Sequence, residues 1–183
     1  MKFKKLIVVG VIAGTLMFHE GLSQSWKLKE SESYIVFIAK NLGMNVSGKI
    51  SGMKVTGSYN NKDIFASNFI GSIDVSTIDT KIDLRNDHLK SDDYFDVEKY
   101  PTITFKSKKI IEAGSTLKVI GDITIKGVTK EIGITFAIER KENKHTLVGN
   151  VTIQRKDFDL GSRTTLIMAD TILVRIFAVF EQI

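Results

Sequence analysis

Apolar and polar residues alternate along most of the chain after Trp26, in short stretches separated by Gly, Asn and Lys. This period of two is typical of strands with one buried face. Residues 116–125 and 128–140 show it most clearly. The residues on their predicted buried faces are Leu117, Val119, Ile123, Ile125, Ile132, Ile134, Phe136 and Ile138. Lys126 and Gly127, which lie between the two stretches, suit a tight hairpin because glycine tolerates positive φ. The pattern therefore predicts an antiparallel meander.

Two stretches are apolar on both faces, "YIVFIA" from Tyr34 and "TILVRIFAVF" from Thr171. Such strands need a cover on their second side, from a helix over the sheet or from pairing of the two chain ends. With few helical patterns, some eight strands predict a mainly β fold, either a closed antiparallel barrel or a sandwich. Closure into a barrel would remove the exposed sheet edges.

A helical pattern occurs around residues 83–98. Leu84, His88, Ser91 and Phe95 recur at a spacing that predicts one inward-facing stripe, and Asp83 is expected to cap the helix. Pro101 is expected to end the helical run and to open the next strand, where proline is tolerated at the first position. We expect a short helix that covers the barrel.

The N-terminal residues 1–23 are typical of a cleaved secretory signal peptide, with lysines before an apolar run from Leu6 to Phe18. The run is short compared with the roughly 20 residues that span a bilayer, so no stable membrane anchor is expected after cleavage. Residues 24–183 then form a single domain, and the protein is expected to be periplasmic or secreted. The chain has no cysteine, so its core must hold it together without disulfides.

The net charge and the candidate catalytic residues favour a binding protein over an enzyme. The chain has 26 basic and 21 acidic residues; without residues 1–23 these fall to 23 and 20, a net charge of +3, which argues against a nucleic-acid partner. The spacing of histidines and carboxylates fits no metal site. A hydrolase that uses His88 with Asp87 and Ser91 lacks an oxyanion loop and a strained nucleophile turn. No cofactor is expected.

Four blocks of residues resemble the YceI-like family of bacterial periplasmic proteins. They are "STIDT" from Ser76, the stretch from Arg85 to Pro101 with Phe105, "GDITIKGVTKEI" from Gly121 and "IQRKDFDLG" from Ile153. The resemblance implies an eight-stranded antiparallel lipocalin-like barrel that encloses a cavity for a long isoprenoid lipid, such as a quinone tail or a polyprenyl phosphate, without catalysis. One departure is Asn41, where relatives often have histidine.

If the barrel is hollow, its inward residues should contact the lipid. The expected lipid-binding set is Phe69, Ile73, Ile103, Phe105, Leu117, Val119, Ile134, Phe136, Val151, Ile153, Val174 and Ile176. Arg85, His88 and Arg155 are candidates for a lipid head group or the barrel mouth, with an internal ion pair to Asp157 or Asp93 as the rival interpretation for Arg155. Two alternatives to a carrier stay open: a hydrolytic enzyme that uses His88, and a filled-core structural or interaction module. A homodimer is also left open.

Overall fold

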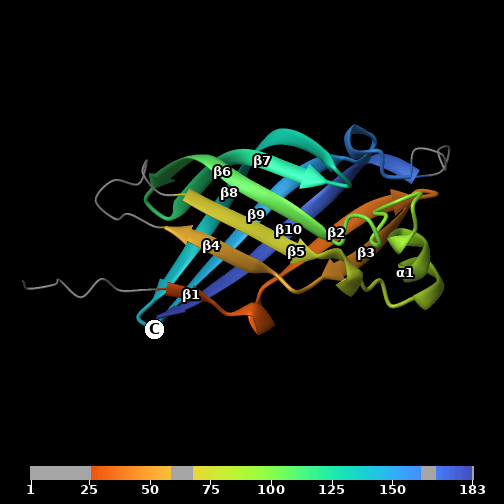
Figure 1. Cartoon of the computed structure of the whole chain (residues 1–183). Helices are drawn as coiled ribbons and strands as arrows, with labels where there is room; N and C mark the ends of the chain where they lie inside the picture. Colours follow the sequence, from red (N-terminus) through yellow and green to blue (C-terminus); the bar gives the residue numbers. More distant parts are fainter. Residues whose placement is uncertain (1–25, 59–67, 162–167, 183) are drawn as a thin grey trace, which may run out of the picture.

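The computed structural model is a single antiparallel sheet that curls into a barrel, with one short helix at an end (Figure 1). The structure describes residues 26–58, 68–161 and 168–182. The elements, in chain order, are β1 (Trp26–Leu28), the 3-10 turn η1 (Glu30–Glu32), β2 (Tyr34–Asn41), β3 (Met44–Ile50), β4 (Lys54–Ser58), β5 (Asn68–Asp74), η3 (Val75–Thr77), α1 (Asp83–Lys90), β6 (Thr102–Ala113), β7 (Thr116–Ile125), β8 (Val128–Lys141), β9 (Lys144–Gln154), η4 (Arg155–Phe158) and β10 (Met168–Gln182).

The described strands pair in the order β3-β2-β10-β9-β8-β7-β6-β5-β4, and β1 pairs with β10. The predicted mainly β barrel is confirmed, but within the described residues the sheet has 10 strands instead of eight. One reason is Gly52, whose φ of +69° turns the chain between β3 and β4. These two strands are the edges of the sheet, so the chain itself joins the edges. The other reason is β1, which at three residues is too short to show a period.

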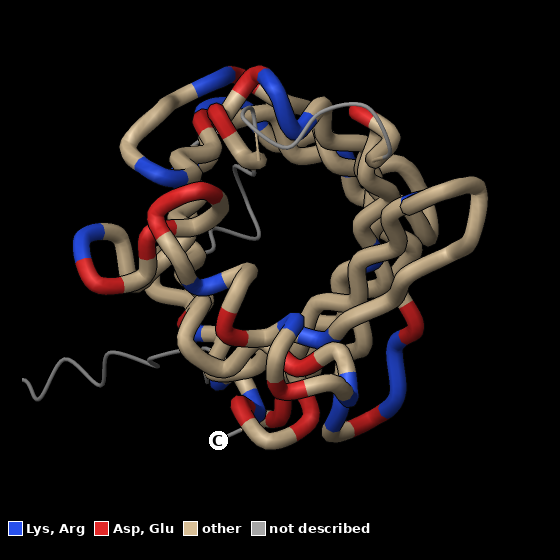
Figure 2. Tube along the Cα trace, turned by 90° about the vertical axis from the view of Figure 1, so that its right-hand side faces the viewer, with Lys and Arg blue, Asp and Glu red and all other residues tan. Residues whose placement is uncertain are grey.

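The meander from β6 to β9 follows the predicted hairpins. Val119 pairs with Ile134 and Leu117 with Phe136, so the alternating apolar faces of β7 and β8 coincide. Lys126 and Gly127 form the turn between them with φ values of +48° and +76°. Positive φ at both central residues suits the right-handed twist of a hairpin. An end-on view shows the strands arranged as a ring (Figure 2).

The helix differs from its prediction. It ends at Lys90, and turns follow it up to Tyr100, so Pro101 does not end the helix. Ile82 occupies the N-cap position and Asp83 is the first helical residue, without a side-chain cap. The predicted inward stripe is also wrong, because Leu84 and His88 are exposed. The buried helical residues are Asn86 and Leu89.

Polar contacts fasten α1 to the segment before it. The Asn86 Oδ1 atom accepts hydrogen bonds from the Thr80 backbone N–H at 2.8 Å and from its hydroxyl at 2.7 Å. The Arg85 Nε–H donates to the same hydroxyl at 2.8 Å, and its Nη2 donates to the Thr80 carbonyl oxygen at 2.8 Å. These bonds satisfy groups that are buried, which explains why a polar face points inward.

The turn that follows α1 packs on the last part of the chain. The Gly161 N–H donates to the Asp93 carbonyl oxygen at 2.7 Å. Lys126 Nζ bridges the Asp92 and Asp159 carbonyl oxygens at 2.7 and 3.0 Å. These segments lie at the same end of the barrel as α1 (Figure 1).

The strands that are apolar on both faces lie side by side, since β2 pairs with β10 along most of its length. Of the two expected solutions, the pairing of the chain ends is present, because β1 and β2 both pair with β10. A helix over the outer face is not present among the described residues, and Ile38 and Leu173 stay exposed there. The expected signal peptide, residues 1–23, lies outside the described residues. None of the helices in the described ranges has the length and apolar character needed to cross a bilayer.

Candidate functional site

The inner face of the barrel is formed mostly by apolar residues. The strand register places the 12 residues of the expected lipid-binding set on this face, where they alternate with residues on the outer face. Four of them are buried: Ile73, Val119, Ile134 and Ile153. The other eight keep part of their surface accessible. Part of the interior is packed, because six of the 12 belong to core clusters that include Leu89 and Phe158: Ile73, Ile103, Val151, Ile153, Val174 and Ile176. The partly accessible Phe69, Phe105, Leu117 and Phe136 lie outside those clusters.

Gly71 shows where the interior has room. It lies on the inner face of β5, opposite Phe105 of β6 and Val55 of β4. A Cβ atom built on Gly71 meets no heavy atom within 4 Å. A side chain at this position would therefore enter open space inside the barrel.

Three phenylalanine rings on the inner face lie against glycines of neighbouring strands. Phe37 covers Gly48 and Phe136 covers Gly149, its direct cross-strand partner in each case. A Cβ on Gly149 would lie 2.6 Å from the Phe136 ring, and one on Gly121 would lie 2.7 Å from the Phe105 ring. The missing Cβ atoms let the rings lie flat against the wall. Phe37 also packs against the core cluster that contains Ile50 and Ala178.

Two of the three candidate head-group residues lie on α1. The Nε and Nη2 groups of Arg85 donate hydrogen bonds to Thr80, so Arg85 positions the helix. His88 is exposed, and its ring packs edge-on against Tyr94 with ring centroids 4.9 Å apart.

Arg155 is only 1% exposed, and each nitrogen of its guanidinium group donates hydrogen bonds to the protein. Nη1 donates to the carbonyl oxygens of Leu160 and Gly161, both at 2.8 Å. Nε and Nη2 donate to the carbonyl oxygens of Ala169 and Met168. Nη2 also pairs with the Asp170 carboxylate at 3.0 Å. The geometry favours the structural interpretation, with Asp170 as the ion-pair partner.

Asn41, where relatives often have histidine, is a polar residue on the inner face. It shares the inward register of Ala39 at the end of β2. Its Oδ1 atom is buried and, among the described residues, is the side-chain oxygen left without a hydrogen-bond partner. An unpaired buried oxygen can accept a hydrogen bond from a hydroxyl of a ligand.

The candidate catalytic residue Ser91 makes a hydrogen bond to the backbone. The Ser91 hydroxyl donates to the His88 carbonyl oxygen at 2.7 Å, so it does not point at the imidazole ring. In the ranges that the structure describes, no group of three or more His, Cys, Asp or Glu side chains is placed to hold a metal ion.

The opposite end of the barrel carries a titratable stack. The rings of Trp26 and His145 lie face to face with centroids 3.7 Å apart and an interplanar angle of 18°. Burial, with a smaller contribution from the Arg140 charge, lowers the pKa of His145. Both rings belong to strands that pair with the last residues of β10.

A groove of about 830 Å³ also lies on the outer face of β2, β8, β9 and β10. Its outward-facing lining residues are Val36, Ile38, Gly133, Asn150, Thr152, Leu173, Arg175 and Phe177. The groove is where the apolar outer faces of β2 and β10 are left uncovered. It is a second place where an apolar molecule could bind, so any test of the interior has to control for it.

A curled antiparallel sheet with a mostly apolar, partly accessible inner face is a β-barrel of the kind that can hold one slender ligand. The family model described as the YceI-like domain matches residues 26–180, and the chain belongs to this family. A UPF0312 protein of Vibrio parahaemolyticus is 30% identical over 140 residues, which cover 72% of this chain and 74% of the relative.

Two solved structures share the fold. BcnA of Burkholderia cenocepacia superposes with a TM-score of 0.77 at 24% identity, over 84% of this chain and 99% of that one. A polyisoprenoid binding domain from Saccharophagus degradans superposes with a TM-score of 0.69 at 16% identity, over 87% of this chain and 99% of that one. At these identities the likeness establishes the barrel fold.

Proposed function

We propose that the protein is an exported carrier that holds one long apolar lipid, an isoprenoid, inside the barrel and does no chemistry on it. The observation that carries this proposal is the mostly apolar inner face with open space at Gly71. The polyisoprenoid binding domain with the same fold supports the choice of ligand class. The signal-peptide pattern of residues 1–23 fits a periplasmic or secreted protein.

The physical basis of binding is the transfer of hydrocarbon out of water. Each buried methylene contributes about 0.8 kcal/mol, so a long isoprenoid offers more gross energy than complexes express as affinity. Part of that energy is lost to ordering of the flexible chain and to incomplete burial. Because hydrocarbon contacts are non-directional, the barrel should discriminate weakly between isoprenoids of similar length. Selectivity is expected from polar groups near one end, such as Asn41.

The proposal is tested by filling the interior. Gly71→Phe places a ring in the open space of the inner face, where the backbone needs no positive φ. We expect this variant to fold and to purify without lipid, whereas the parent protein shows added mass by native mass spectrometry that organic extraction removes.

Gly133→Phe is the matched control. Gly133 lies on the outer face, where a built Cβ meets only side-chain atoms at 3.8 and 3.9 Å, and it lines the outer groove. If lipid is bound in the barrel, this control keeps it. Loss of lipid in Gly133→Phe with retention in Gly71→Phe would move the site to the outer groove and refute the proposal. A lipid-free parent protein from cells rich in isoprenoids would count against any carrier function.

A further inference from the structure

Large apolar side chains are exposed together at the end of the barrel where α1 lies. Among the described residues, four of the eight exposed large hydrophobics lie on its two projecting segments. Leu42 (66% exposed) and Met44 (67%) form the tip of the β2–β3 hairpin. Ile82 (51%) and Leu84 (82%) lie at the start of α1. Figure 1 shows that the hairpin tip and α1 project from the same end of the barrel.

Folding does not account for these residues. Leu42 has a φ of +50°, a left-handed conformation that favours glycine, asparagine or aspartate over leucine. The equivalent position of the β7–β8 turn holds the polar Lys126, with a φ of +48°. Leu84 lies on the helix face that points away from the buried Asn86 and Leu89. An apolar residue that is both exposed and conformationally unfavourable indicates a role outside the fold.

We propose that this end of the barrel docks on a lipid bilayer, with Leu42, Met44, Ile82 and Leu84 inserted at the boundary between head groups and acyl chains. The proposal deepens the carrier function, on which it rests, by giving the barrel a surface for contact with the membrane that supplies or receives its lipid. Apolar side chains on projecting tips suit a bilayer, because the fluid interface closes around each tip separately.

Charge at the base of the tips complements a phosphate layer. Lys40 is exposed two residues before Leu42, and Lys81 directly precedes Ile82 with its side chain 88% exposed. Lysines at this level place their ammonium groups among lipid phosphates while the neighbouring apolar residues reach the hydrocarbon. Asp79 pairs with Lys81 at 2.6 Å, and Asp83 and Asp87 are exposed nearby. We therefore expect apolar insertion to dominate, with a gain of only a few fold on anionic lipid.

The experiment is flotation of the full mature protein with vesicles of phosphatidylcholine, and with vesicles that also contain phosphatidylglycerol. The test variant combines Leu42→Asn, which tolerates the left-handed backbone, with Leu84→Gln, which keeps helix propensity. We expect the parent protein to float with both vesicles and the variant to partition at least tenfold more weakly. The matched control, Ile70→Thr with Ile111→Thr, removes two exposed apolar residues from β5 and β6 and should float like the parent.

Three results would overturn the docking proposal: a parent protein that does not float, a control that loses as much partition as the test variant, or a vesicle-free dimer that depends on Leu42 and Leu84. The last result would assign the surface to a second copy of the chain. Native mass spectrometry of the same samples separates this proposal from the carrier function. A test variant that still holds lipid shows that the interior works, whatever happens at the membrane.

Discussion

Gly149→Ala is the smallest change that should close the interior of the barrel. Gly149 is buried on the inner face of β9, and a Cβ there would lie 2.6 and 2.7 Å from two atoms of the Phe136 ring and 3.1 Å from Ile134. The first two distances are too short for any real contact, so the ring has to move. Strand backbone surrounds it on the wall side, and the open space is on the lumen side. We expect the ring to turn into the lumen.

The magnitude follows from the hydrocarbon that the ring displaces. A phenyl group takes the place of roughly four methylene groups of the bound lipid, which at about 0.8 kcal/mol each is about 3 kcal/mol of lost transfer energy. This figure is an upper value because the lipid can shift along the barrel, so we expect the dissociation constant to rise between tenfold and a hundredfold. The change in folding stability should be small. A rotamer shift of about 1 kcal/mol opposes a gain of about 0.5–1 kcal/mol from replacing glycine in a strand.

The assay is equilibrium binding of a long-chain polyprenol in detergent-free buffer, with urea unfolding of the same samples. Gly149→Ala combined with Phe136→Leu should regain affinity, because the shorter side chain leaves the lumen clear. Gly133→Ala is the matched glycine substitution on the outer face and should bind like the parent. Normal polyprenol affinity in a folded Gly149→Ala protein would show that the lipid does not lie along this wall.

Three further predictions concern the polar residues. Arg155→Met should lower the free energy of unfolding by about 3–5 kcal/mol in urea titrations, because it leaves buried carbonyl oxygens unpaired; a loss below about 1 kcal/mol would contradict the structural role. Asn41→Leu should raise the stability of the lipid-free protein by about 1 kcal/mol, since the lost oxygen has no partner; a destabilised variant would show that Oδ1 is satisfied in solution. The pKa of His145 is lowered by burial and by Arg140, so the folded protein takes up this proton less readily than the unfolded chain, whose pKa is about 6.5. The free energy of unfolding should therefore fall as the pH drops through about 6.5 towards the folded pKa, and it should fall less in His145→Gln. The fluorescence of Trp26, the single tryptophan, should titrate with a midpoint below 6.5. A higher midpoint would refute the assignment.

The inner face of the sheet could be predicted from the sequence because strand alternation is a local property. Each side chain points to one side or the other wherever the strand goes, so the period of two in 116–140 assigns Leu117 and Phe136 to the same face. The register then aligns these two residues as direct partners. The number of strands is harder to predict, because a single residue, Gly52, turns the chain between β3 and β4.

The helix could not be predicted in detail, because its buried face is polar. Asn86 faces inward because its side chain bonds to Thr80, a contact that hydrophobic periodicity cannot show. The periodicity instead selected Leu84, which is exposed. The left-handed Asp96, with a φ of +49°, interrupts the turns after α1, and asparagine or aspartate is the usual choice for such a position.

The open space inside the barrel also could not be predicted from the sequence, because it depends on contacts between strands. Gly48, Gly121 and Gly149 matter because of the rings opposite or diagonal to them, and Gly71 matters because nothing is near it. One signal was available: all four glycines fall at inward positions of their strands. Glycines at such positions in a filled core would be costly, because they bury little surface and lose more chain entropy than other residues.

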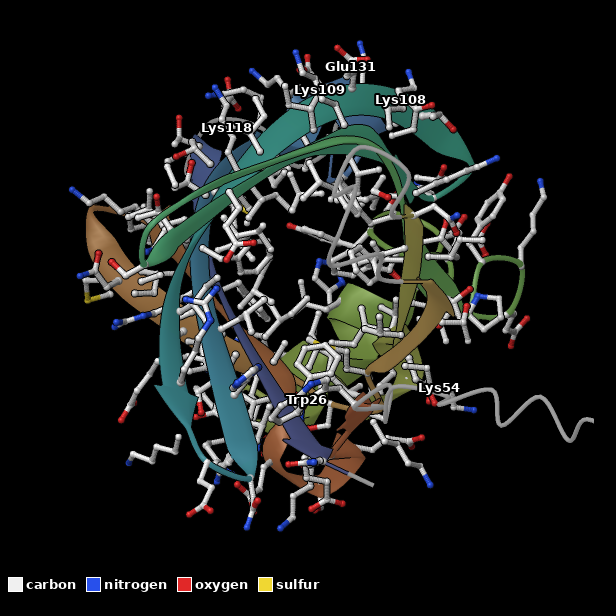
Figure 3. The ribbon with its side chains drawn as sticks, turned by 90° about the vertical axis from the view of Figure 1, so that its left-hand side faces the viewer. Trp26, Lys54, Lys108, Lys109, Lys118 and Glu131 are labelled. Carbon is white, nitrogen blue, oxygen red and sulfur yellow. The ribbon has the colours of Figure 1, made fainter. Side chains whose placement is uncertain are left out.

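The charged signature around α1 and the buried Arg155 then have one physical explanation. The barrel interior is packed in part by core clusters that include Leu89, Tyr94 and Phe158, and polar contacts fasten the segments that carry these side chains. The structure shows such contacts: Asn86 and Arg85 hold α1 to Thr80, and Arg155 ties η4 to the start of β10. Figure 3, which views the barrel from the end opposite α1, shows Trp26 at the rim and the lysines Lys108, Lys109 and Lys118 pointing outward. Polar residues that first suggest catalysis therefore have a simpler use, since their hydrogen bonds fasten segments whose apolar side chains pack into the barrel.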